Sequence, residues 1–366
     1  KIMFDFIPAS DYTAIYYHLL LIVTLYMFMQ SRVYFIEQVE SVKATQNLGY
    51  ILLVFTLLYM GTRPISWAFG DMGTYAEGFQ KIQLDPNLPV KTDVFFGYFT
   101  RFCAGLMDVN TYFFLVDVIY IIPCYFFAKK YFSEYWFIPF LMMVGSFSFW
   151  SYGTNGIRNG MATSLFIFSL LFYQKQKWLM YAIMGLAYGF HNSLMIPIAA
   201  FLVSGLYKNP KIYLYIWLAA IPLSLVAGGF WESFFGSLGI GDERVNQYLT
   251  QNKEYQDQMS NTGFRWDFVV YSAFAVFAGY YYIIRRGFKD EFYTHLWGTY
   301  MIANAFWILV IRANFSNRFA YLSWFLMAIV IAYPLLKVKF WDDHYKNVGR
   351  IFLAYYLFTY FMFLKS

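Results

Sequence analysis

The chain has 366 residues, of which 60% are hydrophobic, 24% aromatic and only 13% charged. Soluble globular domains carry about 25% charged residues, so this composition excludes that class of protein. The two cysteines exclude a disulfide-stapled scaffold, and the basic residues, which give a net charge of +6, are too scattered to indicate a nucleic-acid partner.

Apolar segments of about membrane-spanning length follow one another along the sequence. They are apolar on all sides, as in residues 50–60 and 320–332, whereas the strands of a membrane β-barrel alternate in polarity. The sequence therefore predicts an all-α polytopic membrane protein, with a single integral membrane domain over residues 1–366. The candidate spans are residues 12–29, 48–62, 111–128, 135–151, 156–173, 211–229, 266–284, 293–311, 318–336 and 350–364.

Lysine clusters give the orientation of these spans, because the cytoplasmic loops of membrane proteins are rich in basic residues. Two such clusters lie at 129–130 and 175–177. The resulting orientation places two hydrophilic loops, residues 63–91 and 230–265, on the outer side of the membrane.

Two segments do not fit a simple crossing in that orientation. Residues 92–108 lie between an outer loop and a span whose far end is basic, so we expect a re-entrant segment there. Residues 178–206 lie between two lysine clusters on the same side, which predicts two half-helices that meet at His191. Non-helical backbone at membrane depth is tolerated only inside protein or beside a water-filled cavity, so both segments predict a cavity that opens outward.

Arginine has the opposite distribution from lysine. Outward arginines run against the positive-inside tendency, and the planar guanidinium group binds phosphate or carboxylate oxygens in pairs. A lipid substrate with a diphosphate group in the outer leaflet would favour them on that side. The arginines predicted to lie outside are Arg63, Arg101, Arg158, Arg244, Arg265, Arg312 and Arg318.

Arg63 ends the second span, and Asp71 and Tyr75 follow it in the outer loop. One interpretation is an interfacial arginine that snorkels to water, with Asp71 as a helix cap. The other interpretation is a phosphate ligand near a carboxylate.

Arg158 lies in the sequence GTNGIRNG, where the predicted span at 156–173 begins. A helix N-terminus presents free N–H groups and the positive end of its dipole, so an added guanidinium group makes an anion site. The alternative is a glycine-rich turn that packs helices closely, with Arg158 among the lipid headgroups.

His191 lies in the sequence GFHNS, at the predicted break between half-helices. Histidine exchanges a proton near neutral pH, which suits a general base that acts on a sugar hydroxyl. The alternative is a packing residue whose ring nitrogens are satisfied by neighbours.

Three arginines of the later spans are further candidates. Arg265 closes the second outer loop, and Arg312 and Arg318 flank a short turn. Each alone is compatible with a headgroup phosphate, but together they indicate a binding site. The sequence has no nucleotide-binding P-loop and no CxxC, HExxH or clustered-aspartate motif, so we expect neither metal nor cofactor, and ATP-driven transport is unsupported.

The chain resembles the EpsG and Wzy group of polysaccharide polymerases over about residues 48–336. The spacing of Arg158 and His191 is the most specific part of the resemblance, and Asn159 departs from it, since relatives often carry Gln there. The other matching features are Arg63 with Asp71 and Tyr75, the re-entrant segment, GIRNG at 156–160, residues 185–193, and Asn317 with Arg318.

The resemblance implies a GT-C-like glycosyltransferase of about 10–13 transmembrane helices, including re-entrant ones, with a cavity on the outer side of the bacterial cytoplasmic (inner) membrane. Such an enzyme moves a growing glycan from undecaprenyl pyrophosphate onto the next lipid-linked repeat unit. The membrane lipid and a chain-length regulator are the further partners that the resemblance allows.

The charges suggest how the residues would share this work. Arg158, Arg312 and Arg318, with Arg63 or Arg265, would hold the donor pyrophosphate and stabilise the leaving group. His191 would accept the proton of the acceptor hydroxyl, with Asp71 as the rival base.

Three other functions stay open. An O-antigen ligase uses the same donor but transfers the glycan to the lipid A core. A transporter or flippase for lipid-linked sugars would also use broken helices, although we find no convincing internal repeat. A membrane-bound acyltransferase would leave the outer arginines unused, so we favour the polymerase.

Overall fold

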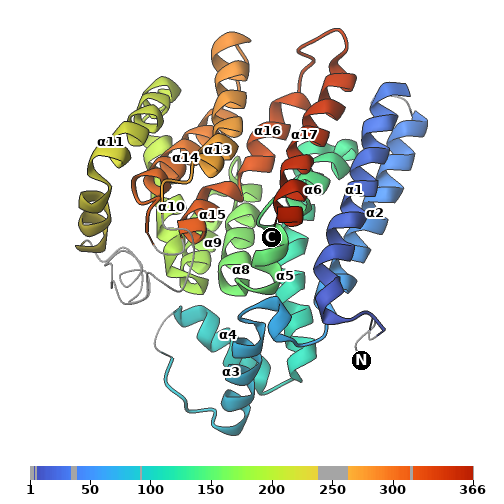
Figure 1. The fold of residues 1–366 in the computed structure, drawn as a ribbon, viewed down its shortest axis with the longest axis vertical. Helices are drawn as coiled ribbons and strands as arrows, with labels where there is room; N and C mark the ends of the chain where they lie inside the picture. The colour runs from blue at the N-terminus through green and yellow to red at the C-terminus, as the bar shows by residue number, and fades with distance from the viewer. Residues whose placement is uncertain are drawn as a thin grey trace. The chain divides into compact units, whose positions relative to one another are not determined.

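The structure is a computed structural model that describes residue 4 and residues 6–33, 39–90, 93–237, 263–313 and 316–365. These residues form helices joined by turns, and no strand occurs among them (Figure 1). The predicted outer loop at 230–265 lies mostly beyond this part of the chain, because residues 238–262, with Arg244, are outside the described residues.

Within the described ranges, seven helices are long and apolar enough to cross a membrane. The prediction of an all-α, multi-pass membrane protein is therefore confirmed. These helices cover residues Ala9–Val33, Val42–Gly61, Val109–Tyr135, Pro210–Ser237, Trp266–Arg285, Ser316–Leu335 and His344–Lys365.

The predicted span at 135–151 is wrong as a single helix. Helix α6 (Phe137–Val144) ends at Gly145, and α7 (Phe149–Thr154) begins after a turn in which the N–H of Phe149 donates to the carbonyl of Ser146. Glycine and serine favour turns over a helix interior. Hydropathy does not register this break, because the residues on both sides of it are apolar.

Several helices are too short to cross a bilayer, which takes about 20 residues. Residues 92–108 contain α4 (Val94–Ala104), which has 11 residues, as expected for a segment that does not span. The predicted outer loop at 63–91 contains a short helix and a longer one, η1 (Trp67–Phe69) and α3 (Met72–Leu84). Further short helices include α8 (Ile157–Ser169), α9 (Lys177–Phe190) and α10 (Met195–Leu206).

The chain divides into two compact units, of which the first comprises residues 1–191 and 335–366. In this unit α5 (Val109–Phe132) packs against α2 (Val39–Gly61), α6 and α8, and α9 packs against α8 and α4. Helix α1 (Ala9–Val33) runs beside α17 (His344–Lys365), as Figure 1 shows.

Buried hydroxyl groups join the helices of the first unit at the broken region. The Tyr16 hydroxyl donates to the carbonyl of Val144, the last residue of α6, at 2.7 Å. The Tyr120 hydroxyl donates to the carbonyl of Phe149 at 2.9 Å, and the Ser164 hydroxyl donates to the carbonyl of Tyr120 at 2.6 Å. A carbonyl at the C-terminal end of a helix lacks an intrahelical partner and needs another donor in an apolar environment, so the Tyr16 hydroxyl supports the broken end of α6.

The second unit comprises residues 192–334. Its central helix α14 (Glu291–Leu309) packs against α10, α11 (Pro210–Ser237) and α15 (Ser316–Trp324), and the unit also contains α13 (Trp266–Gly279) and α16, which begins at Met327. A buried amide joins these helices: Asn304 accepts from Trp217 Nε1 at 2.7 Å and donates to the Ser272 and Ser323 hydroxyls.

Candidate functional site

A buried carboxylate, Asp93, lies between two of the predicted site residues in the first unit. Its Oδ2 atom accepts a hydrogen bond from Nη1 of Arg158 at 2.5 Å and lies 3.3 Å from Nδ1 of His191. The Asp93 side chain is fully buried, whereas those of Arg158 and His191 are 16% and 18% exposed. Asp93 therefore contacts Arg158 and His191 from the protein interior, and both of these side chains remain partly exposed.

The backbone of Asp93 lies in the left-handed region, with φ 49° and ψ 61°. Few residues other than glycine adopt this conformation, although aspartate does so more often than most. The residue precedes α4 at the position of a helix cap, yet its side chain makes no cap hydrogen bond. Strain of this kind concentrates at functional sites, and here it accompanies a carboxylate that contacts Arg158 and His191.

Arg158 lies in the first turn of α8, which begins at Ile157, so its predicted position at a helix N-terminus is confirmed. Its Nε atom donates to the Tyr75 hydroxyl at 3.2 Å, and its guanidinium carbon lies 5.9 Å from the ring centres of both Tyr75 and Phe96. Two atoms of the guanidinium group are thereby oriented by α3 and by the start of α4.

His191 directly follows the last residue of α9, and the predicted break at this residue is confirmed. Its backbone is extended, with φ −156° and ψ 116°, and its N–H donates to the carbonyl of Ala187. The end of α9 approaches α4 closely, because a Cβ atom at Gly189 would lie 2.2 Å from the ring of Phe95. In the tautomer in which Nδ1 donates to Asp93, the lone pair of the imidazole lies on Nε2.

Asp71 lies at the start of α3, in the N-cap position before Met72. It occupies the cap position, but its side chain makes no cap hydrogen bond, so the capping alternative is not what the structure contains. Its backbone N–H donates to Oδ1 of Asn155 at 2.7 Å. Asp71 therefore fixes the start of the helix that carries Tyr75 one turn later.

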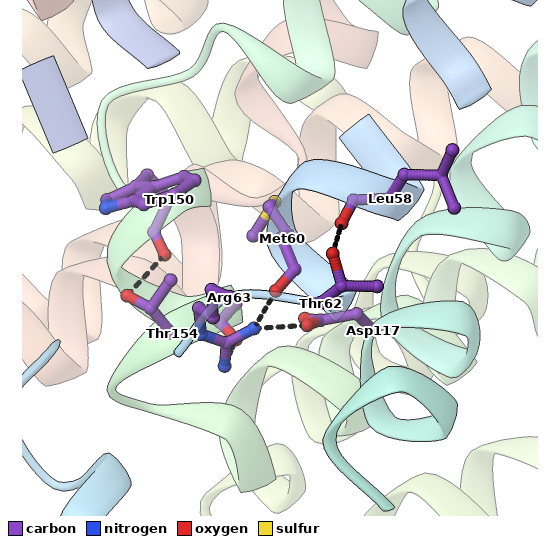
Figure 2. Close-up of polar contacts among 8 residues, drawn as sticks. Leu58, Met60, Thr62, Arg63, Asp117, Trp150 and Thr154 are labelled. Atoms are coloured by element: carbon purple, nitrogen blue, oxygen red, sulfur yellow. Dashed lines mark hydrogen bonds and ion pairs between the residues drawn. The ribbon is translucent and has the colours of Figure 1, made fainter. Parts of the chain in front are cut away.

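Arg63 lies in a different buried cluster, which Figure 2 shows. Its guanidinium group pairs with Asp117 of α5, and both side chains are fully buried. The same group donates to the carbonyls of Met60, at 2.5 Å, and Gly153, at 3.1 Å. An arginine enclosed by protein in this way does not fit the snorkelling alternative.

The other three arginines predicted to bind the pyrophosphate belong to the second unit. Arg265 donates two hydrogen bonds to Asp267, from Nε at 2.9 Å and from Nη2 at 2.6 Å. Arg312 donates to the carbonyl of Ser224 at 3.0 Å, and Arg318 lies in the first turn of α15. Their grouping with Arg158 around one ligand stays a prediction.

Sequence reasoning missed the two acidic partners, Asp93 and Asp117. Asp117 lies inside the predicted span at 111–128, and a carboxylate within an apolar span is itself a signal of a paired or functional group. Asp93 is the second residue of the predicted re-entrant segment at 92–108, and a charge at the start of an apolar segment is a similar signal. Neither local pattern says which arginine is the partner.

Comparison with protein families supports a relationship that extends along most of the chain. The model of the EpsG family matches residues 46–366. No curated protein and no solved structure matches the sequence. Because the family match covers far more than half of the 366 residues, the chain belongs to the EpsG family, a membership that indicates a polysaccharide polymerase.

Proposed function

We propose that this protein polymerises a polysaccharide at the outer face of the bacterial cytoplasmic membrane. It transfers a growing glycan from undecaprenyl pyrophosphate to the non-reducing end of a lipid-linked repeat unit. The observation that carries the proposal is the Asp93 carboxylate with Arg158 on one side and His191 on the other. This arrangement supplies an anion-binding group and a proton acceptor side by side, as glycosyl transfer from a diphosphate requires.

Arg158 binds the donor pyrophosphate in this proposal. Its guanidinium group and the N-terminus of α8 both favour negative charge, and the negative charge on the diphosphate grows as the glycosidic bond breaks. Asp93 balances the arginine when no substrate is bound. Tyr75 holds the guanidinium group through Nε, so the arginine is oriented before the substrate arrives.

His191 is the general base. The acceptor hydroxyl oxygen attacks the anomeric carbon, the bond from that carbon to the pyrophosphate oxygen breaks, and the hydroxyl proton moves to Nε2 of His191. Undecaprenyl pyrophosphate leaves with the bonding electrons, and the anomeric configuration inverts. Asp93 keeps Nδ1 protonated and orients the ring, which is the role of a carboxylate behind a catalytic histidine.

The other predicted residues have supporting places in the proposal. Arg312 and Arg318, with Arg265, contribute further contacts to the pyrophosphate, and Asp71 is the rival base. The cavity holds the sugars of both lipid-linked substrates and opens outward, as in a GT-C-like enzyme. A chain-length regulator is the partner that would set the size of the polymer.

The experiment is a profile of surface glycan and of undecaprenyl-linked sugars in a strain that lacks this gene. A polymerase predicts accumulation of a single lipid-linked repeat unit, and the wild-type gene restores a ladder of lengths. Long polymer that stays on the carrier would instead indicate a ligase, and repeat units confined to the cytoplasmic leaflet would indicate a flippase.

A further inference from the structure

The Arg63 and Asp117 pair is the buried ion pair that the proposed chemistry does not use. Asp117 lies within the membrane-spanning helix α5, and Arg63 follows the end of α2. Neither side chain has any exposed surface. Charged groups inside a membrane protein are costly and occur mainly where they serve a function, so we expect this pair to have one.

The contacts of Arg63 join three separate parts of the first unit. Nη1 contacts Asp117 and the carbonyl of Met60, as Figure 2 shows. Nη2 donates to the carbonyl of Gly153 in α7. The rings of Phe69 and Phe113 lie 6.0 and 5.7 Å from its guanidinium carbon. Because the guanidinium group is rigid and planar, its contact with α5 fixes the direction in which Nη2 meets α7.

The pair is poorly arranged as a source of stability. Among the described residues, Nε of Arg63 and Oδ1 of Asp117 are buried without a hydrogen-bond partner. Burial of an incompletely satisfied ion pair often contributes less than apolar residues of the same volume would. Stability alone therefore does not explain the retention of two charges at this place.

The carbonyl that Arg63 binds belongs to the turn that carries the site. Gly153 lies in the last turn of α7, Asn155 follows it, and Arg158 lies in the first turn of α8. A Cβ atom at position 153 would lie 2.2 Å from the methyl group of Met60 and 2.9 Å from the ring of Tyr120. The α7 backbone therefore sits directly against α2 and α5, which leaves the turn little freedom.

The same turn also sets the second contact of Arg158. Asn155 accepts the backbone N–H of Asp71, which begins α3, and α3 carries Tyr75. Tyr75 in turn accepts a hydrogen bond from Arg158. A displacement of the turn thus moves the arginine and its tyrosine partner together.

We infer that Arg63 and Asp117 are positioning residues, which hold the turn from Gly153 to Arg158 in register with α5. Arg63 acts through this turn and does not itself contact the substrate. The polymer readout of this inference rests on the proposed function, whereas its structural readout does not.

The test compares two variants of the full chain with the wild type. The double variant Arg63→Met with Asp117→Leu removes both charges and keeps similar volume, and Arg63→Lys keeps the charge but loses the planar fork. The matched control is Arg350→Lys, which alters an exposed arginine that contacts Asn347. Each is assayed for abundance in the membrane, for thermal unfolding of the purified protein and for the polymer ladder.

A spin-label distance measured without substrate reports the turn itself. Ser151 of α7 and Asn110 of α5 are exposed, so cysteines at these positions accept labels, whereas Cys103 and Cys124 are buried. We expect both variants to broaden or shift this distance, and the control to leave it unchanged. A displacement of about 1 Å lowers an enzymatic rate by as much as about 100-fold, so the ladder is expected to fall by about 10- to 100-fold at near wild-type abundance.

Three results would overturn the inference. A double variant with the wild-type distance and ladder would show that the pair positions nothing. A double variant that inserts but unfolds at a much lower temperature would assign the pair to stability. Loss of the ladder with an unchanged distance would assign Arg63 to the substrate. If deletion of the gene leaves the polymer intact, the proposed function fails, but the distance still decides the inference.

Discussion

Oδ2 of Asp93 lies 3.3 Å from Nδ1 of His191, although the two residues are 98 positions apart in the sequence. The contact brings the start of α4 to the end of α9, and the same oxygen accepts a hydrogen bond from Arg158. One buried carboxylate therefore orients both groups to which we assign the chemistry.

Replacement of His191 by glutamine is expected to abolish most polymer formation. The amide cannot accept a proton, and general base catalysis contributes about 10²- to 10⁴-fold to a rate. The measurement is the labelled glycan ladder in a strain whose only copy of the gene carries the variant, with membrane abundance by immunoblot. His18→Gln is the control, since His18 lies in α1 and contacts Tyr360 of α17. A wild-type ladder in the His191 variant would return the role of base to Asp71.

Replacement of Asp93 by asparagine keeps the shape of the side chain and removes its charge. We expect the ladder to fall by about 100-fold, because the histidine loses its orienting acceptor and the arginine its counter-charge. Asp93→Glu keeps the charge and should recover part of the loss. Asp342→Asn, at an exposed position, is the matched control. Equal ladders in the Asn and Glu variants would contradict a role for the carboxylate charge.

The sequence predicted those parts of the site that local patterns encode. A polar GFHNS inside an apolar segment marks the break at His191, and GTNGIRNG marks the helix start at Arg158. Asp93 and Asp117 are visible in the sequence as charges beside or inside apolar segments, but their arginine partners are not, because a pairing between distant helices leaves no trace in local composition. The break between α6 and α7 was missed for a related reason. The residues on both sides of Gly145 and Ser146 are apolar, so hydropathy predicts one continuous span.

Arg158→Ala is expected to lose the polymer while the protein still inserts into the membrane. Arg158→Lys keeps the positive charge but loses the contact of Nε with Tyr75 and the ability to bind two phosphate oxygens at once. We therefore expect the lysine variant to retain no more than about a tenth of the wild-type ladder. The abundance of both variants in the membrane should match that of the wild type. A lysine variant with full activity would show that Arg158 contributes only its positive charge.

Tyr75→Phe removes a single hydroxyl group from the site. The hydrogen bond to Nε of Arg158 is worth about 1 kcal/mol, so we expect a loss of about 3- to 10-fold in the rate of polymer formation and little change in abundance. Tyr98→Phe changes an exposed tyrosine of the adjacent helix α4 and serves as the control. The comparison is made on the early time points of ladder growth, where a difference in rate is not hidden by completion. Identical rates for the two variants would show that the hydroxyl does not orient the arginine.

Gly160→Ala tests whether α8 must approach α7 as closely as the structure has it. A Cβ atom at position 160 would lie 2.4 Å from the carbonyl oxygen of Tyr152, and a backbone oxygen cannot move aside as a flexible side chain can. The start of α8 must then shift, which is expected to lower the free energy of unfolding by about 1–3 kcal/mol. Because Arg158 lies in the same turn, the ladder should weaken as well.

Gly185→Ala is the matched substitution in α9, where no atom lies within 4 Å of the added methyl group. Alanine is a better helix former than glycine by about 1 kcal/mol, so this variant should unfold at the same temperature as the wild type or above it, with an unchanged ladder. Thermal unfolding of the two purified variants, measured side by side, separates the effect of close packing from the general effect of a glycine replacement. If both variants unfold at the same temperature, the contact between α7 and α8 at Gly160 is looser than the structure indicates. That contact would then not hold Arg158 in place.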